Sequence, residues 1–452
     1  MIIMDVVIKN GLVFDPRWEK PQRLNVGLKG EKIAVITEKG LTGETVIDAE
    51  GKVVSPGFIN IHSHSDKNFK GQGYYFETAE SELKMGVTTL VGGNCGVSPI
   101  DFKEYRDYIN ENGAPNNYLG FMGHTSLRAA AGKQDRYTPA NAGEIAKMRD
   151  FLKRGMESGA IGLSFGLEYA PGTDMEEISG VCEALKEFPD ALLSAHYRYD
   201  ADRASEGVEE MIEISKTTGI PMQISHLNSG ICFGRAKDSL EVFHRARANG
   251  IDVMADCYPY NAFSTYIGSA VFDPGCLEKW NAGYEDLQVA EGEFAGQRCT
   301  EELFNRLRSE NPDIYLNAFV MKEEEVVEVL KDPFTMIASD GLLRGGQGHP
   351  RVSGTFPRVL GRYSRELKAL TLKEALYKMT TMPAERLRLR GRGVLEEGAF
   401  GDIVIFDYSV IIDKADFTRP ALSPEGIEYV LVNGRPAVFD GKVVNKKLGR
   451  AL

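Results

Sequence analysis

The middle of the chain alternates short apolar runs with amphipathic segments, and this alternation constrains the fold more than any other feature of the sequence. Continuous apolar runs of this length are typical of strands that are buried on both faces of a parallel sheet. Helical periodicity separates most of them, as at residues 142–158, 204–217 and 239–249, and a closing helical segment follows at residues 372–380. Eight β/α units predict an α/β fold, the (β/α)8 TIM barrel. The eight runs are residues 57–62, 88–95, 118–123, 161–169, 192–198, 222–227, 253–260 and 334–340.

The spacing of these runs is interrupted once, between the seventh and the eighth. Residues 261–333 fill this interval, which is longer than a single crossover helix requires. We therefore expect an insertion within the barrel domain that serves as a lid or as a substrate-facing subdomain.

The two ends of the chain differ from the middle, because they carry short strand-like segments separated by Gly, Pro and charged residues. Neither end is long enough to close a core alone, so we expect the two to pair. The sequence thus predicts a small β-sandwich domain from residues 1–55 and 395–452, and a catalytic barrel domain from residues 56–394. The expected strands of the small domain are residues 5–9, 11–14, 24–28, 33–36, 46–48, 402–406, 427–432, 435–439 and 442–444.

Charge and cysteine content exclude several classes of protein. The 53 Lys and Arg residues against 65 Asp and Glu residues give a formal net charge of −12, which argues against a nucleic-acid binder. No apolar run approaches the roughly 20 residues that span a bilayer, and the first residues lack the pattern of a secretory signal. Six scattered cysteines do not form a disulfide framework and fit a reducing compartment. We expect a cytoplasmic protein with no membrane or nucleic-acid partner.

Residues with metal-binding chemistry lie at or just after the ends of the expected strands, where a TIM barrel builds its active site. The first run ends in His62-Ser63-His64, and residues i and i+2 of a strand point to the same face, so both imidazoles can reach one ion. Cys95 ends the second run among glycines, where a thiolate could ligate or bridge zinc. Each residue alone has an ordinary structural alternative, such as a buried cysteine or a hydrogen-bonded core histidine. Their joint placement at separate strand ends favours a metal site. The remaining members are His196, His226 and Asp340, at the ends of the fifth, sixth and eighth runs.

The other three histidines have different contexts. His124 ends the third run and is either a contact of the site or a structural residue. His244 lies in a helical segment beside two arginines, which predicts a solvated face. His349 belongs to a glycine-containing loop shortly after Asp340, and the same loop carries Arg351. The Arg351 guanidinium is a natural clamp for a substrate carboxylate.

In this order the motifs resemble those of the D-aminoacylases, which are N-acyl-D-amino-acid deacylases of the amidohydrolase superfamily. The resemblance covers essentially the whole chain, and it is specific because the cysteine after the second strand distinguishes this family from most of the superfamily. The motifs are His-x-His (62–64), Gly-Gly-Asn-Cys-Gly (92–96), Gly-Leu-Glu-Tyr-Ala-Pro-Gly (166–172), His-Tyr-Arg (196–198), Ser-His-Leu (225–227), Asp-Cys-Tyr-Pro-Tyr (256–260), Ser-Asp-Gly (339–341), His-Pro-Arg (349–351), Gly-Thr-Phe-Pro-Arg (354–358), Gly-Asp-Ile-Val-Ile-Phe-Asp (401–407) and Val-Asn-Gly (432–434).

The resemblance implies a zinc-dependent hydrolase of N-acyl-D-amino acids, whose substrate is a small molecule with a free carboxylate. One zinc would be held tightly by Cys95, His196 and His226. A second, weaker position would be formed by His62, His64 and Asp340, and Asp340 would be the general base. The expected substrate contacts are Tyr169, Ser264 and Arg351 around the α-carboxylate, together with Tyr258 and His349. Asn228 stands where the family often carries a lysine associated with acidic substrates, which predicts a preference for neutral side chains.

Two other functions remain open at this stage. One is a cyclic amide hydrolase of the hydantoinase or dihydropyrimidinase type, on the same barrel. Those enzymes usually bridge two metals with a carbamylated lysine from the fourth strand, and residues 161–169 contain no lysine. The other is a non-catalytic scaffold, which the presence of every expected ligand disfavours.

Overall fold

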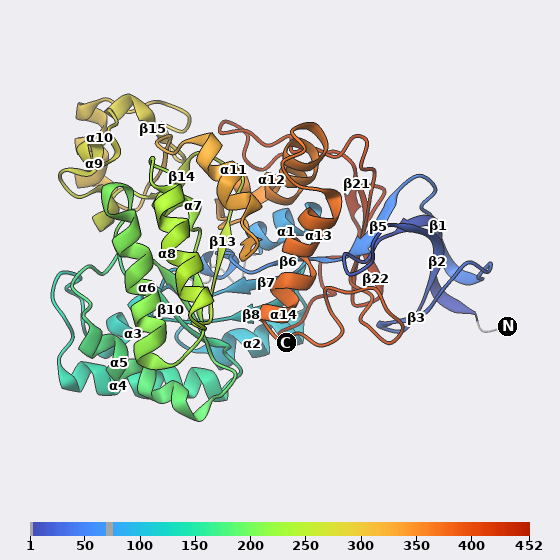
Figure 1. Cartoon of the computed structure of the whole chain (residues 1–452), viewed down its shortest axis with the longest axis horizontal. Helices are drawn as coiled ribbons and strands as arrows, with labels where there is room; N and C mark the ends of the chain where they lie inside the picture. Colours follow the sequence, from blue (N-terminus) through green and yellow to red (C-terminus); the bar gives the residue numbers. More distant parts are fainter. Residues whose placement is uncertain (1–2, 69–75) are drawn as a thin grey trace.

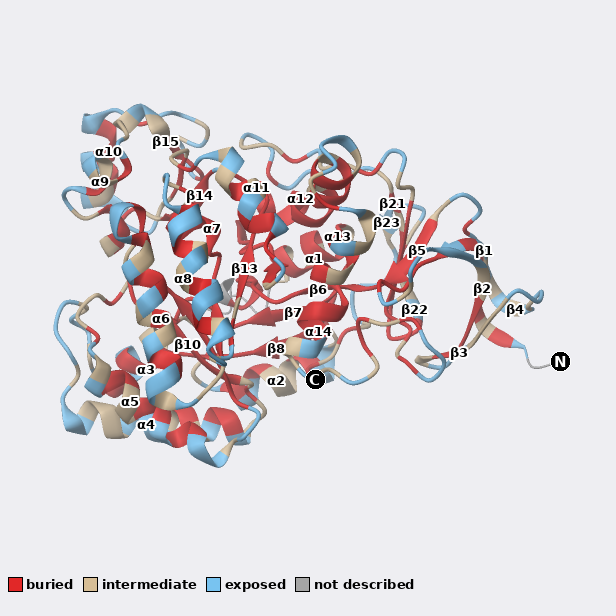
Figure 2. Cartoon of the chain, viewed as in Figure 1, coloured by how far each residue is buried: buried red, intermediate tan, exposed pale blue. Residues whose placement is uncertain are grey.

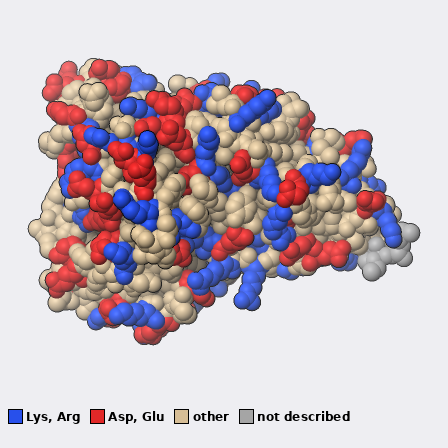
Figure 3. Space-filling view, in the orientation of Figure 1, with Lys and Arg blue, Asp and Glu red and all other residues tan. Residues whose placement is uncertain are grey.

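The computed structural model of the chain describes residues 3–68 and 76–452. Figure 1 shows an α/β body that carries most of the chain and, beside it, a β-rich part where the N-terminal strands lie. In the described part of the chain, no helix combines the length and the apolar character needed to cross a membrane. Basic and acidic side chains are interspersed on the face shown in Figure 3 and do not gather in one basic patch.

The β-rich part is a nine-stranded sheet that combines both ends of the chain. The two ends meet where β5 pairs antiparallel with β20, so that Val54 lies opposite Ile405. Eight of the strands follow one hydrogen-bonded path, and β4 lies off this path and pairs with β1. The division of the strands into the two layers of a sandwich stays a prediction, as do the domain boundaries. The strands are β1 (Met4–Val13), β2 (Gln22–Lys29), β3 (Lys32–Thr37), β4 (Gly43–Asp48), β5 (Val53–Pro56), β20 (Ile403–Phe406), β21 (Ile427–Val432), β22 (Arg435–Phe439) and β23 (Lys442–Val443).

One expectation for this sheet was wrong in detail, since residues 5–9 and 11–14 were expected as separate strands. The structure has a single strand, β1, whose pairing with β2 shifts register between Ile8 and Gly11. Asn10 has a φ of 61° at this irregularity, and asparagine tolerates the left-handed region better than most residues. The bulge lets the chain continue as one strand where the sequence signals a break.

The α/β body contains two parallel sheets, and each of the eight expected runs supplies strand residues to them. The sheets are joined by backbone hydrogen bonds at both ends: Ile161 N–H, just before β10, donates to the Gly120 carbonyl of β8 (3.0 Å), and Asp340 N–H donates to the His62 carbonyl (2.9 Å). Most strand residues are buried, which explains their continuous apolar character (Figure 2). The strands are β6 (Phe58–Asn60), β7 (Val87–Gly92) and β8 (Asn117–Gly120) in one sheet, and β9 (Met122–Gly123), β10 (Gly162–Gly166), β11 (Leu192–His196), β12 (Met222–Ile224), β13 (Val253–Cys257) and β17 (Thr335–Ile337) in the other.

Helices connect these strands, and their outer faces carry the exposed residues in Figure 2. Local sequence signals start two of them, because Asn141 with Glu144 and Thr371 with Glu374 form capping boxes at α4 and α13. The helices are α1 (Glu77–Lys84), α2 (Phe102–Asn112), α3 (His124–Ala131), α4 (Ala142–Glu157), α5 (Met175–Cys182), α6 (Ala204–Thr218), α7 (Asn228–Ile231), α8 (Ala236–Ala248), α11 (Glu323–Lys331), α12 (Arg351–Arg358), α13 (Leu372–Met379) and α14 (Thr381–Arg386).

Most of the interval between β13 and β17 forms a separate small unit, the inserted unit, at the upper left in Figure 1. Its strands β14 (Phe263–Tyr266), β16 (Tyr315–Ala318) and β15 (Leu287–Val289) form an antiparallel sheet in that order. Helices α9 (Cys276–Trp280) and α10 (Glu301–Glu310) complete it, and its core includes Phe272 packed edge-on against Trp280 and Phe304. After β17 the chain forms the hairpin of β18 (Leu343–Arg344) and β19 (Gln347–Gly348).

Candidate metal centre and active site

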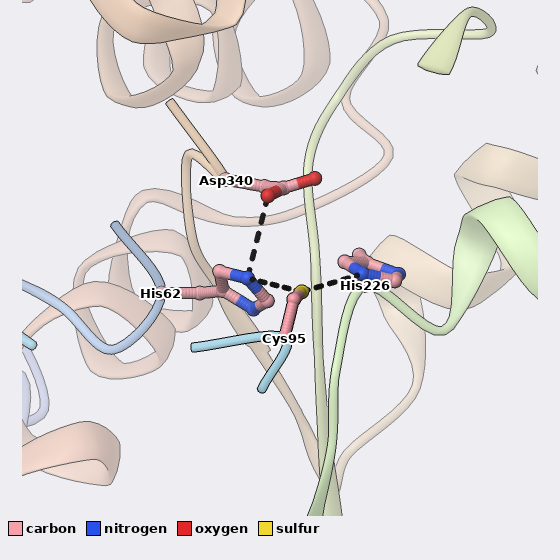
Figure 4. A group of neighbouring side chains, drawn as sticks. All are labelled: His62, Cys95, His226 and Asp340. Atoms are coloured by element: carbon pink, nitrogen blue, oxygen red, sulfur yellow. Dashed lines mark hydrogen bonds and ion pairs between the residues drawn. The ribbon is translucent and has the colours of Figure 1, made fainter. Parts of the chain in front are cut away.

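Four side chains from four different strand ends converge in the α/β body (Figure 4). The Cys95 Sγ lies 3.3 Å from His62 Nε2 and 3.4 Å from His226 Nε2, and His62 Nε2 lies 3.3 Å from Asp340 Oδ1. One ligand atom from each residue lies within 4.8 Å of the others, and all four residues are buried. Thiolate sulfur, imidazole nitrogen and carboxylate oxygen are the ligands that zinc takes in proteins, so the donor set fits a zinc ion.

The two other expected ligands border this group. His64 Nε2 lies 2.9 Å from Asp340 Oδ1, and His196 Nδ1 lies 3.0 Å from His226 Nε2. All six residues singled out as ligands from the sequence therefore lie together in the structure.

The backbone at three of these residues adopts a left-handed conformation that the sequence analysis did not predict. Cys95, His226 and Asp340 have φ angles of 52°, 34° and 50°, in the left-handed region that non-glycine residues rarely occupy. Such a conformation costs on the order of 1–3 kcal/mol per residue and concentrates at functional sites. At each strand end this turn of the backbone accompanies a side chain that faces the shared centre.

Each of three histidines has a polar partner on the nitrogen that points away from the centre. His62 Nδ1 lies 3.3 Å from Asp256 Oδ1, His226 Nδ1 lies 2.9 Å from Ser229 Oγ, and His196 Nε2 lies 3.0 Å from Glu168 Oε2. Partners of this kind set the tautomer and the orientation of a metal-binding imidazole. Sequence reasoning assigned no role to Asp256, Glu168 or Ser229, although the first two belong to motifs that stand out in the chain.

The electrostatics of the centre favour anionic sulfur and anionic carboxylate. Burial opposes ionisation of the Cys95 thiol, but the neighbouring His62 and His226 imidazoles outweigh it and hold the Cys95 pKa well below its usual range. Burial also opposes ionisation of Asp340, and the Arg351 guanidinium with the two imidazoles holds its pKa well below the ordinary value. Both groups are thus in the form that binds a cation.

A cavity opens onto the centre, and His64, Cys95, His196, His226 and Asp340 line it. The inserted unit supplies part of its wall, including Phe263, Ser264, Thr265 and Tyr315. A small molecule bound in this cavity would therefore lie beside five of the six candidate ligands.

The expected carboxylate clamp lies in this cavity. Arg351 Nη1 lies 2.8 Å from Asp340 Oδ2, its Nη2 donates to the Ser264 carbonyl (3.3 Å), and its guanidinium lies 4.7 Å from the centre of the Tyr258 ring. The Tyr169 hydroxyl lies 3.0 Å from Thr265 Oγ1. Arg351, Tyr169, Ser264 and Tyr258 all line the cavity.

His349 also lines the cavity, but both of its ring nitrogens are occupied. Its Nε2 donates to the Ala262 carbonyl (3.1 Å), and its Nδ1 accepts from the Arg351 N–H (3.0 Å). The ring therefore fixes the start of the helix that carries Arg351.

Asn228, the remaining expected substrate contact, lies apart from the others. This residue is fully buried and is not among the residues that line the cavity. Its amide donates to the Tyr258 carbonyl (3.2 Å) and accepts from the Tyr258 N–H (3.4 Å), so both of its polar groups serve the backbone. A preference for neutral substrates consequently needs another physical basis.

The two remaining histidines lie outside the cavity lining. His124 is buried with its Nε2 3.0 Å from Glu177 Oε1, a carboxylate that Arg128 also contacts. His244 is on the exposed side of α8, with 44% of its side chain accessible, and it contacts Asp332.

Comparison with known proteins gives consistent matches over nearly the whole chain. A family model described as the amidohydrolase family matches residues 45–325 and 324–438. A D-aminoacylase of Alcaligenes xylosoxydans xylosoxydans is 32% identical over 480 residues, covering 99% of this chain and 97% of that protein. An N-acyl-D-glutamate deacylase of the same organism is 33% identical over 481 residues, covering 99% and 96%. A solved structure of N-acyl-D-glutamate deacylase from Bordetella bronchiseptica, complexed with zinc and a phosphonate inhibitor, matches with a TM-score of 0.88 and 30% identity over 100% of both chains.

Proposed function

The chain belongs to the amidohydrolase family and to the D-aminoacylase group within it, as its motifs indicated, and from this membership we propose that it hydrolyses the linear amide bond of N-acyl-D-amino acids. The products are a carboxylate and a free D-amino acid. The observation that carries the proposal is the convergence of Cys95, His62, His226 and Asp340 beside a cavity that contains Arg351. We also infer that the two parallel sheets form the (β/α)8 barrel, which their hydrogen bonds at both ends support.

The metal that fits this donor set is zinc. Cys95, His196 and His226 would hold one ion tightly, and His62, His64 and Asp340 would provide a second, weaker position. When bound, zinc would lower the pKa of water to about 7 and polarise the carbonyl of the scissile amide.

The protein's own groups carry the remaining steps. The Asp340 carboxylate accepts the proton of the attacking water and delivers it to the departing nitrogen, because an amine leaves only when it is protonated. The Arg351 guanidinium, with Tyr169 and Ser264, holds the α-carboxylate so that the acyl carbon meets the nucleophile. The contact between Arg351 and Asp340 (2.8 Å) places the clamp and the base side by side.

A neutral substrate side chain is favoured by the charges around the cavity. Apart from Arg351, which the α-carboxylate would occupy, two cations lie at or beside its wall, and each already contacts a carboxylate: Arg344 contacts Glu291 (3.1 Å), and Lys279 contacts Asp200 (2.7 Å) and Glu168 (3.1 Å). A second substrate carboxylate would lose hydration without gaining an uncommitted cation in the described part of the wall. The near-equal identities to the D-aminoacylase and to the glutamate-specific relative do not separate these preferences, so the argument depends on the charges.

The cyclic amide hydrolase is the second candidate on this fold. Strand β10 (Gly162–Gly166) and the rest of residues 161–169 contain no lysine that could be carbamylated to bridge two metals. Cys95 lies between His62 and His226 and would be a metal ligand in place of that lysine. Without the lysine, the linear-amide reaction is the better supported of the two.

The experiment that tests the proposal is hydrolysis of a substrate panel by enzyme of known metal content. The panel contains N-acetyl and N-formyl derivatives of D- and L-methionine, leucine, aspartate and glutamate, together with hydantoins. We expect turnover of the neutral D-derivatives above all others. Preferred ring opening of hydantoins, or no turnover by the zinc-loaded protein, would overturn the function, and equal kcat/KM for N-acetyl-D-glutamate and N-acetyl-D-methionine would overturn the side-chain preference.

A further inference from the structure

A line of charged groups runs from the half-buried Lys279 of the inserted unit, through the buried Glu168, to the candidate zinc ligand His196. Glu168 Oε2 lies 3.0 Å from His196 Nε2, and Glu168 Oε1 accepts from the Lys279 ammonium (3.1 Å). Glu168 is only 9% exposed. One oxygen of this carboxylate thus contacts the imidazole, and the other contacts a lysine that is 111 residues away in the sequence.

Lys279 is itself held in place by two independent contacts of helix α9. Its ammonium lies 2.7 Å from Asp200 Oδ1, and the indole N–H of the adjacent Trp280 donates to Asp200 Oδ2 (2.8 Å). The Trp280 ring packs against Phe263 (centroids 5.2 Å apart). Asp200 therefore fixes where α9 lies, and α9 fixes where the ammonium meets Glu168.

We propose that Glu168 and Lys279 are positioning residues of the metal centre. Through them the inserted unit orients the candidate ligand His196. The His196 Nδ1 faces His226 while its Nε2 is bound to Glu168, so the carboxylate sets which nitrogen is free for the ion. Lys279 donates a charge-assisted hydrogen bond to Glu168 Oε1 (3.1 Å) and so fixes the orientation of the carboxylate. The inference uses the proposed function in one respect only, the assignment of His196 as a zinc ligand.

The competing explanation is that Lys279 merely fastens the inserted unit to the rest of the molecule. The structure contains a second fastening that allows this to be tested. Arg344 Nη1 lies 3.1 Å from Glu291 Oε1, and Gln347 Oε1 accepts from the Gly292 N–H (2.8 Å), which ties the hairpin β18–β19 to the inserted unit. Neither of these contacts includes a candidate metal ligand.

The test measures zinc affinity by competition with a chelator, using full-length wild-type protein and four variants. Glu168→Gln keeps the shape of the side chain and removes its charge, and we expect a loss of zinc affinity of roughly 10- to 100-fold. Lys279→Met should lower the zinc affinity by a smaller factor. Lys279→Arg keeps the positive charge and should bind zinc with an affinity close to that of the wild type. Arg344→Met is the matched control, because it removes a cation that ties down the inserted unit without touching the ligand set. It should bind zinc as wild type does.

A second readout is the visible spectrum of the Co²⁺-loaded protein, since cobalt accepts the same nitrogen and sulfur ligands. Glu168→Gln and Lys279→Met should change this spectrum, and Arg344→Met should not. Unchanged affinity and spectrum in Glu168→Gln, or an equal loss of affinity in Arg344→Met, would overturn the inference. A raised KM of Lys279→Met with normal metal affinity would also overturn it, because the lysine would then be a substrate contact. If wild-type protein retained no zinc at all, the proposed function itself would fail.

Discussion

Replacing Asp340 by asparagine separates the chemistry of this carboxylate from its shape. The substitution leaves the volume of the side chain almost unchanged, so it creates no cavity beside His62 and His64. An amide cannot accept a proton from water, and a positioned general base typically contributes a factor of 10² to 10⁴ in rate. At about 1.4 kcal/mol for each tenfold change, the barrier should rise by about 3–6 kcal/mol.

The structure also predicts how this loss divides between kcat and KM. In the wild-type protein the Asp340 carboxylate contacts the Arg351 guanidinium at 2.8 Å. Removal of that negative charge leaves Arg351 more available to a substrate carboxylate. The loss should therefore appear in kcat, whereas KM should stay level or fall.

The assay is steady-state hydrolysis of N-acetyl-D-methionine, with metal content measured on the same samples. Asp256→Asn is the matched control: Asp256 is another buried aspartate beside His62 (3.3 Å), but it does not line the cavity. Its loss should weaken the metal site, and added zinc should restore activity, whereas zinc should not rescue Asp340→Asn. A kcat of Asp340→Asn within tenfold of the wild-type value would refute the assignment of Asp340 as the base.

Three further predictions follow from particular contacts. Cys95→Ala should lose the tightly bound zinc while Cys182→Ala, at a buried cysteine of α5, retains it; full zinc content in Cys95→Ala, measured by elemental analysis, would contradict the ligand assignment. Arg351→Lys keeps the charge but loses the planar fork, and the loss of one charge-assisted hydrogen bond of about 1.5–3 kcal/mol should raise KM roughly 10- to 100-fold; an unchanged KM would place the clamp elsewhere. Burial raises the pKa of Glu82 from 4.5 to about 8, despite hydrogen bonds from Asn60 and Ser339, so the folded state keeps a proton that the unfolded state releases. Stability should consequently fall as the pH rises from about 4.5 to 8, and Glu82→Gln should remove this dependence. The check is Tm against pH for the two metal-free proteins, and parallel curves would show that Glu82 does not titrate in this range.

Much of the candidate site was predictable because it depends on local patterns. Buried parallel strands are continuous apolar runs, and their carboxyl ends meet at one edge, so polar residues at those ends were expected to lie together. This reasoning located His62, His64, Cys95, His196 and Asp340 without any knowledge of distances. The motifs around them carried the family resemblance, which the family model and the relatives confirm.

Tertiary structure alone decided where side chains point once a strand has ended. Local periodicity does not extend past that point, and long-range hydrogen bonds take over, such as the one from Asp340 N–H to the His62 carbonyl. The left-handed backbone at Cys95, His226 and Asp340 is a result of this kind. The position of the Asn228 side chain is a second result of this kind, because both of its polar groups form hydrogen bonds with the Tyr258 backbone.

The sequence by itself determined the order of the strands and the chemical types of residue at their ends, because both follow from short-range patterns of apolar and polar residues. Only the folded chain decided that Glu168 would lie between His196 and Lys279. No spacing rule connects residues 111 positions apart, one on the loop after a buried strand and the other on a short helix of the inserted unit. Their contact exists because the Trp280 indole and the Asp200 carboxylate fix the helix against the rest of the protein, and packing of that kind depends on the whole fold.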